Sequence, residues 1–206
     1  KLYRERNLEK VIMLISECGY NAIEPLFDVE TNLDSDYIKA ILSKYNISIS
    51  GLRTGGIYLN TGISLLDPDY VRRREALEKL LNSIIFARSF NTNILIGLVQ
   101  GNMNPKVPRE ISLKWQRESL RECAEVAAKN NILLMIEPIN RGELNHTNTI
   151  EEVKTLIQDI DKENIRILID TYHMNLEEKD IEGAIFNAKD YIGHVHIADT
   201  ERKIPG

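Results

Sequence analysis

The sequence is poor in cysteine, and its thiols are not arranged as a disulfide framework or a thiolate metal site. Cys18 and Cys123 are the only cysteines among 206 residues, and no C-x-x-C pair occurs. Structural zinc sites and redox motifs depend on such close pairs. Both cysteines fall in stretches with a helical pattern. We therefore expect both to be buried and reduced, which is typical of a cytoplasmic protein.

Long apolar runs and an excess of basic residues are also missing. No run reaches the ~18 apolar residues that a membrane span requires, and no basic segment followed by an apolar one opens the chain. The net charge is −5 and the sequence pI is about 5.5. Binding to a phosphate backbone normally calls for a basic stripe. We therefore expect neither a membrane nor a nucleic acid as partner.

Helical and strand patterns alternate along the whole chain. Apolar residues recur at helical spacing over 8–18, and Gly19 ends that pattern. Asp67 and Pro68 combine a capping residue with a first-turn proline. The predicted helices are 8–18, 35–45, 67–90, 108–130, 149–161 and 180–190. The predicted strands are 21–25, 47–52, 94–99, 132–136, 165–169 and 192–197.

The composition of the predicted strands indicates a parallel sheet. Strands 132–136 and 165–169 are almost continuously apolar, which is typical of strands buried on both faces. Their alternation with helices fits either a doubly wound α/β fold or a TIM (β/α)₈ barrel. No G-x-G-x-x-G or G-x-x-x-x-G-K-[ST] motif follows a predicted strand. That absence disfavours the nucleotide-binding version of the doubly wound fold.

The number of strands bears on how much of a barrel is present. A TIM barrel has eight strands and typically ~250 residues, whereas this chain offers six predicted strands. We expect residues 1–206 to form one domain, an incomplete TIM barrel without its first strand and its last βα unit. The chain begins at Lys1 and ends in a loop at Gly206, so both ends read as cut. Open strand edges would permit association into a homo-oligomer.

Each of the last three predicted strands ends in a side chain that can bind a metal. Glu137 follows 132–136, Asp170 follows 165–169, and His196 lies near the end of the last strand. The strand ends of a barrel line one mouth, where active sites of TIM barrels lie. A single Asp after a strand is often a helix cap, and a single His can be a core residue. Three in succession indicate a shared site for a divalent ion, Mn²⁺ first, with Mg²⁺ or Co²⁺ also suitable.

Further polar residues follow these strand ends, in loops above the same mouth. Glu143 follows the first candidate ligand by six residues, His173 follows the second by three, and Arg202 follows the third by six. Any one of them could be a solvated loop residue. As a set they offer a carboxylate, an imidazole and a guanidinium to a polyhydroxy substrate.

The segments around these residues resemble a known family. The resemblance rests on I-E-P-I-N-R-G-E (136–143), L-I-D-T-Y-H-M-N (168–175), H-V-H-I-A-D-T-E-R (194–202), G-L-V-Q-G (97–101) and, more loosely, G-L-R-T-G-G (51–56). These segments are similar to the D-tagatose 3-epimerase group of the xylose isomerase-like TIM barrels, which stands beside the hydroxypyruvate isomerases. Residues 96–101, together with E-P-I-N-R-G-E (137–143) and D-T-Y-H-M-N (170–175), are particularly similar to 5-keto-L-gluconate epimerases. The resemblance covers essentially the whole chain.

The resemblance implies a metal-dependent epimerase or isomerase of keto-sugars, with one divalent metal ion as cofactor and a small sugar as substrate. Glu137 would be a metal ligand and one of two acid/base carboxylates. Asp170 and His196 would be the other two metal ligands within this chain. Glu143, His173 and Arg202 would hold the substrate. The metal would act as a Lewis acid and steady an enediolate. One carboxylate would remove a proton and another would return it on the opposite face.

In this family the second carboxylate, also a metal ligand, belongs to the eighth strand, which lies beyond this chain. We therefore expect residues 1–206 alone to form an open barrel and to bind metal weakly. Proton exchange through Glu137 would survive in such a chain, but inversion would not. If the chain does epimerise a ketose, Glu24 or Glu143 becomes the candidate for the second acid/base group.

Three alternative functions remain open at this point. One is a hydroxypyruvate isomerase-like aldose–ketose isomerase, because that reaction also passes through an enediolate. A second is a non-catalytic sugar-binding barrel, which the residue ending the eighth strand would decide. The least favoured is an endonuclease IV-like phosphodiesterase, whose multi-zinc site needs more histidines. We take His194 to alternate with His196 along their strand and so to point away from the barrel interior.

Overall fold

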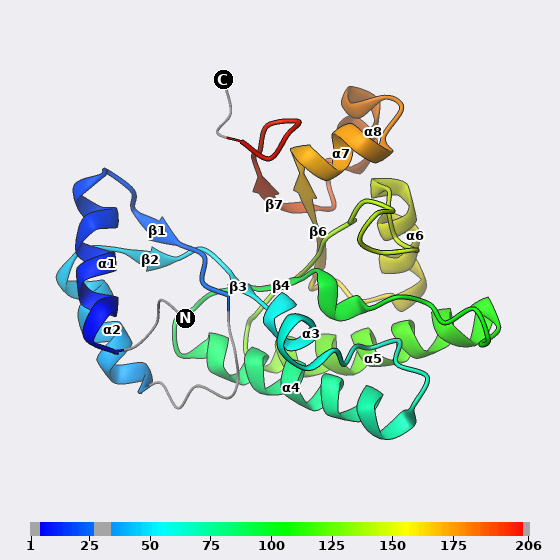
Figure 1. The fold of residues 1–206 in the computed structure, drawn as a ribbon, viewed down its shortest axis with the longest axis horizontal. Helices are drawn as coiled ribbons and strands as arrows, with labels where there is room; N and C mark the ends of the chain where they lie inside the picture. Colours follow the sequence, from blue (N-terminus) through cyan, green and yellow to red (C-terminus); the bar gives the residue numbers. More distant parts are fainter. Residues whose placement is uncertain (1–4, 27–33, 204–206) are drawn as a thin grey trace.

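The computed structural model describes residues 5–26 and 34–203, and its helices are packed against a curled parallel sheet (Figure 1). The strands are β1 (Ala22–Ile23), β2 (Ser48–Ile49), β3 (Leu52–Arg53), β4 (Ile94–Ile96), β5 (Leu134–Ile136), β6 (Ile165–Asp170) and β7 (Ile192–His196). The helices are α1 (Glu5–Glu17), α2 (Ser35–Lys44), α3 (Gly55–Thr61), α4 (Tyr70–Arg88), α5 (Arg109–Lys129), α6 (Ile150–Ile160), α7 (Thr171–Glu177) and α8 (Ile181–Ala188), with a 3₁₀ turn η1 (Leu98–Gln100).

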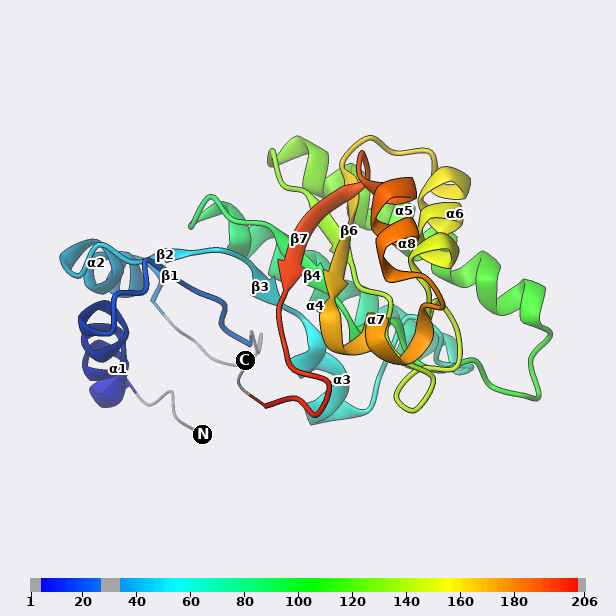
Figure 2. The ribbon, with the colours of Figure 1, turned by 90° about the horizontal axis from the view of Figure 1, so that it is seen from above.

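The strand order identifies the architecture as part of a TIM barrel. Strands β3, β4, β5, β6 and β7 pair in sequence order, and every pair is parallel. A doubly wound sheet would instead reverse its order at a switch point. Strands β1 and β2 form a second parallel pair, and a single bridge from Leu26 to Arg53 links the two sets. Figure 2 shows β6 and β7 side by side. The expected partial TIM barrel is thus confirmed.

The predicted strand 47–52 is divided into β2 and β3 at Ser50 and Gly51. Gly51 faces the neighbouring strand so closely that a Cβ atom there would lie 2.8 Å from Cδ1 of Leu95. The backbone approaches Leu95 only because residue 51 has no side chain. Alternating apolar residues gave no sign of this break, because β-branched residues continue up to Ile49.

Other element boundaries also differ from expectation. The predicted strand 94–99 ends at Ile96, and η1 follows it. Short apolar runs do not distinguish a strand from a tight helical turn, which explains the overlong prediction. Helix α3 begins one residue after β3, and α7 begins directly after β6. Neither was predicted, because seven residues give too few apolar repeats to stand out.

Two layers of apolar side chains lie on the two faces of the sheet. The larger one packs the sheet against the helices and includes Ile94, Ile136 and Ile167, all less than 1% exposed. On the other face, a small separate cluster contains Leu95, Met135 and Leu168. Because side chains alternate along a strand, the residue two positions after Met135 or Leu168 also faces the barrel interior.

The cysteine expectation is half right. Both thiols are free, and Cys123 is buried in α5, but Cys18 is exposed. Helix α1 ends at Glu17, and its buried face is marked by Leu8 and Ile12. Cys18 lies beyond the helix and off that face. In the described ranges 5–26 and 34–203, no helix is long and apolar enough to cross a membrane.

Candidate functional site

The three side chains at successive strand ends meet at one point. One ligand atom from each of Glu137, Asp170 and His196 lies within 4.8 Å of the others. Nδ1 of His196 is 3.5 Å from Oε1 of Glu137 and 3.7 Å from Oδ2 of Asp170. All three side chains are between 15% and 23% exposed. They therefore line a partly enclosed mouth that solvent can reach.

The parallel register of the sheet brings these residues together. Asp170 is directly paired with His196 across β6 and β7. Ile136 is paired with Ile167 across β5 and β6, and Glu137 is the next residue after Ile136. Since neighbouring parallel strands end at the same edge, their terminal side chains share one mouth.

Asp170 caps a helix and also presents an oxygen to the mouth. Its Oδ1 accepts a hydrogen bond of 2.7 Å from the backbone N–H of Tyr172, and Asp170 is the N-cap of α7. Its Oδ2 faces His196. A carboxylate can accept at both oxygens, so the helix cap fixes the orientation of Asp170 and leaves one oxygen directed at the mouth.

The electrostatics of the mouth favour a positive charge at its centre. Burial by itself lowers the pKa of His196, but the neighbouring carboxylates of Asp170, Glu137 and Glu24 raise that pKa to about 11. Burial likewise works against ionisation of Asp170, yet His196 and the N–H of Tyr172 hold the pKa of Asp170 below its usual value. Three carboxylates around one ring create a negative potential. A proton or a metal cation bound there would balance it.

His173 lies at the edge of this mouth on α7 and is 5% exposed. The backbone N–H of Asn140 donates to its Nδ1 at 3.3 Å, and the Asn140 side-chain nitrogen lies 2.8 Å from the same atom. Nδ1 therefore serves as the acceptor, and Nε2 is turned toward Oε1 of Glu137 at 3.9 Å. Sequence reasoning missed Asn140, although it stands inside the quoted segment 136–143.

Arg202 and Glu143 close the rim of the mouth. Nη2 of Arg202 donates to Oε1 of Glu143 at 2.6 Å and lies 3.4 Å from Nε2 of His173. The Arg202 guanidinium also lies over the Tyr172 ring, 4.2 Å from its centroid. Asn140 donates to the same Glu143 oxygen at 3.1 Å. All six residues singled out from the sequence thus lie in or beside one mouth.

His194 does not point away from the barrel interior, and that prediction was wrong. Its Nε2 lies 2.9 Å from Oε2 of Glu24, while Nε2 of His196 lies 2.9 Å from Oε1 of the same carboxylate. Residues two apart on a strand share a face, so His194 and His196 project to the same side. Glu24, His194 and His196 form a second group of atoms within 4.8 Å.

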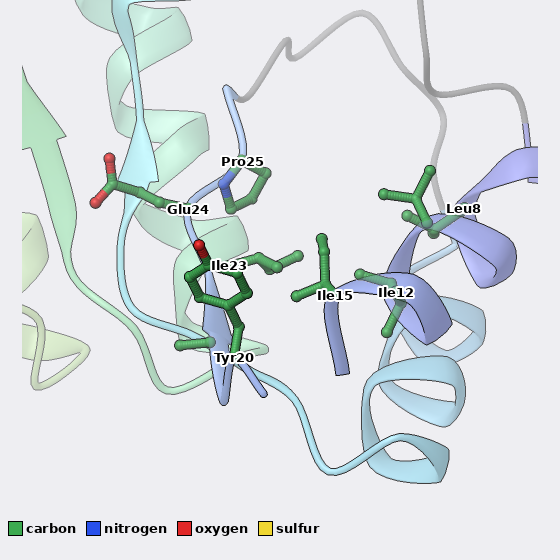
Figure 3. Close-up of a pocket in the computed structure, with 9 residues that line it drawn as sticks. Leu8, Ile12, Ile15, Tyr20, Ile23, Glu24 and Pro25 are labelled. Atoms are coloured by element: carbon green, nitrogen blue, oxygen red, sulfur yellow. The ribbon is translucent and has the colours of Figure 1, made fainter. Parts of the chain in front are cut away.

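Glu24 directly follows the last residue of β1, and its side chain reaches His194 and His196 on β7. Although burial favours its neutral form, hydrogen bonds to His194 and His196 lower the pKa of Glu24 to about 2. Figure 3 shows the Glu24 carboxylate turned away from an apolar cavity of about 310 Å³, lined by side chains such as Ile12 and Ile23. Glu24 thus lines the cavity with the rest of the residue, while its carboxylate is directed at the polar mouth.

His146 has a structural place outside the mouth. It is 2% exposed, and its Nε2 lies 2.8 Å from the carbonyl oxygen of Gly101. Its Nδ1 lies 3.0 Å from the hydroxyl of Thr147. Both ring nitrogens are therefore occupied by hydrogen bonds within the loop region.

Comparison with known proteins places the chain in a family. The family model described as "Xylose isomerase-like TIM barrel" matches residues 12–205. A D-psicose 3-epimerase of Ruminiclostridium cellulolyticum is 40% identical over 94 residues, which are 45% of this chain and 32% of that enzyme. An L-ribulose 3-epimerase of Methylomonas sp. is 26% identical over 196 residues, 94% of this chain and 67% of that enzyme.

The fold of solved structures agrees with this match. The apo crystal structure of a 3-keto-D-glucoside 4-epimerase from E. coli superimposes with a TM-score of 0.86 at 23% identity, covering 100% of this chain and 79% of that one. At that identity the likeness concerns the fold alone. The segment matched in the first of the curated relatives spans about a third of that relative's length. The chain belongs to the xylose isomerase-like TIM barrel family.

Proposed function

We propose that the chain carries the metal-binding and proton-transfer site of an epimerase that acts on keto-sugars. The observation that carries this proposal is the convergence of Glu137, Asp170 and Nδ1 of His196 within 4.8 Å at the mouth of a barrel. The relatives that match the chain are named as ketose epimerases, which supports the same reaction class.

The donor set fits a hard or borderline divalent ion. Two carboxylate oxygens and one imidazole nitrogen are ligands that Mn²⁺, Mg²⁺ and Co²⁺ accept, and no thiolate lies among them. Space beside Glu137 is kept free by Gly97, where a Cβ would lie 2.7 Å from Oε2. Glu137, Asp170 and His196 would hold the ion, Mn²⁺ being our first choice. When bound, it would supply Lewis-acid polarisation of the substrate carbonyl.

Glu137 is the residue that we assign to proton transfer. Its carboxylate takes the proton from the carbon beside the substrate carbonyl. The electron pair of that C–H bond forms a carbon–carbon double bond, and the π pair of the carbonyl moves onto its oxygen to give an enediolate. His173, whose Nε2 faces the same oxygen at 3.9 Å, orients a substrate oxygen beside it. Arg202 and Glu143, joined at 2.6 Å, bind substrate hydroxyls at the rim.

Inversion needs a second acid/base group on the opposite face of the substrate. We propose that this group lies outside residues 1–206, in the part of the barrel that follows β7.

Two free thiols, one of them exposed, support the cytoplasm as the location of the protein. An aldose–ketose isomerase would begin with the same proton abstraction but would return the proton to the neighbouring carbon, without inversion.

Deuterium exchange with solvent tests this proposal. D-Psicose is incubated with Mn²⁺ in D₂O, with the 206-residue chain and with a version extended to the length of its relatives. Mass spectrometry and NMR then follow deuterium at C3 and formation of the epimer. We expect exchange in both proteins, epimer formation in the longer one, and loss of both signals in Glu137→Gln. Absence of exchange from both wild-type proteins would contradict the proposal. Epimerisation by residues 1–206 alone would mean that the second group lies within them.

A further inference from the structure

Glu24 receives two imidazoles on one carboxylate. Nε2 of His196 lies 2.9 Å from Oε1 and 3.1 Å from Oε2, and Nε2 of His194 lies 2.9 Å from Oε2. The side chain of Glu24 is 19% exposed, and the two histidines are 23% and 18% exposed. These contacts join the residue that follows β1 to β7, and the two strands do not pair with each other in the described sheets.

The contact decides which nitrogen of His196 keeps its proton when the ring is neutral, as it must be to bind a metal. An ionised carboxylate can only accept a hydrogen bond, so the Nε2 that faces Glu24 must be the donor. In the neutral ring, Nδ1 then holds the lone pair. That same Nδ1 is the atom that lies 3.5 Å from Glu137 and 3.7 Å from Asp170. Ligating histidines commonly donate their other N–H to a carboxylate in this way.

We propose that Glu24 is a positioning residue, which holds the His196 ring so that Nδ1 is presented to a metal ion between Glu137 and Asp170. His194 assists by donating to the second oxygen of Glu24 and thereby limiting rotation of the carboxylate. The ring planes of His194 and His196 are nearly perpendicular, at 89°, with centroids 5.3 Å apart. That packing restricts the rotation of the His196 ring as well. This inference rests on the proposed metal site and adds a function for residues outside its ligand set.

A separate cation held by Glu24, His194 and His196 is the competing interpretation, because their ligand atoms also lie within 4.8 Å. The hydrogen-bonded distances of 2.9 Å argue against it, since the two rings already donate to the carboxylate. Nε of Arg53 also stands 3.8 Å from Oε1 of Glu24. A guanidinium at that distance repels a second cation. It therefore favours an ionised carboxylate with no metal ion bound to it.

Metal affinity of the 206-residue chain measures this role directly. Titration calorimetry with Mn²⁺ compares the wild type with Glu24→Leu, which removes the acceptor, and Glu24→Gln, which keeps an acceptor oxygen without the charge. Loss of a carboxylate that orients a ligating histidine typically weakens metal binding ~10–100-fold. We expect that loss in Glu24→Leu and a smaller one in Glu24→Gln. Glu9→Gln is the matched control, because Glu9 on α1 pairs with Lys44 on α2, away from the mouth.

A spectroscopic measurement separates positioning from general stability. With Mg²⁺ bound, ¹⁵N NMR of the histidine rings should show a proton on Nε2 of His196 and none on Nδ1 in the wild type. Thermal unfolding of all variants without metal gives the reference for folding. The NMR result on the wild type stands by itself if a Glu24 variant does not fold.

The outcomes are distinct. Weaker Mn²⁺ binding in Glu24→Leu, rescued in part by Glu24→Gln and not seen in Glu9→Gln, supports the positioning role. Unchanged affinity in both Glu24 variants overturns it while the metal site stands. A proton on Nδ1 of His196 with Mg²⁺ bound overturns it too, and would also remove that nitrogen from the proposed metal ligands. Two Mn²⁺ ions per wild-type chain, falling to one in Glu24→Leu, would make Glu24 a ligand of its own ion and would also overturn it. A wild type that binds no Mn²⁺ contradicts the proposed function itself.

Discussion

Gly97 lies directly against the carboxylate of Glu137: a Cβ atom at position 97 would stand 2.7 Å from Oε2. The atom in its way is the free end of a side chain and not backbone. The carboxylate can therefore move aside while the strand keeps its place. In consequence, this glycine constrains the site more than it constrains the fold.

Replacing Gly97 with alanine should thus harm metal binding more than stability. We expect Gly97→Ala to weaken Mn²⁺ binding about tenfold or more, as displaced ligands do, and to change the unfolding midpoint little. Gly55→Ala is the control, because a Cβ there would meet nothing closer than 3.9 Å. Calorimetry and thermal unfolding of the two variants provide the comparison. Equal Mn²⁺ affinity in both would show that Glu137 tolerates the displacement.

The two roles of Asp170 can be separated by a pair of substitutions. Asp170→Ser retains an oxygen that can cap α7, whereas Asp170→Ala does not, and both remove the charge beside His196. We expect both to lose Mn²⁺ binding. The alanine variant should have a free energy of unfolding lower than that of the serine variant by about 1 kcal/mol, the usual value of a helix N-cap. Urea denaturation of both variants measures that difference, and equal stabilities would mean that the cap contributes nothing.

Arg202 should act on the substrate and not on the metal. Its guanidinium bonds Glu143 at 2.6 Å and stacks over Tyr172. We expect Arg202→Ala to raise KM for the sugar roughly tenfold, the effect of losing one charged hydrogen bond, with Mn²⁺ affinity unchanged. Arg202→Lys keeps the charge but loses the planar stacking, so it should fall between the two. Loss of metal from Arg202→Ala would move this residue into the ligand set.

The two thiols should differ sharply in reactivity. Cys18 is exposed, whereas Cys123 is buried and burial raises the pKa of its thiol well above the usual range. Because the thiolate is the reactive form, a maleimide at neutral pH should modify Cys18 and spare Cys123. Intact mass spectrometry should show one addition to the native chain, none to Cys18→Ser and two to the denatured wild type. Two additions to the native chain would contradict the burial of Cys123.

The sequence was sufficient to find the alternation of strands and helices that is typical of a barrel, and the residues of the mouth. Parallel strands of a barrel all end at one edge, so the position of Glu137, Asp170 and His196 after apolar strands already implied that they meet. Loop residues such as Arg202 followed from the same geometry, because short βα loops remain above the strand that they follow. Their exact contacts, including the one through Asn140, could not be read from spacing.

Only the tertiary structure revealed what stands behind His196. Glu24 and His194 lie 170 positions apart in the chain, and no local pattern relates them. The curl of the sheet brings β1 to face β7, and the curl arises from strand twist and packing of the whole barrel. The two-residue period of a strand alone would have shown that His194 and His196 face the same side. It could not have shown that Glu24 is the partner of His194, because a hydrogen bond across a barrel depends on how the sheet closes in three dimensions. A position at a strand end, by contrast, depends only on the order of elements along the chain.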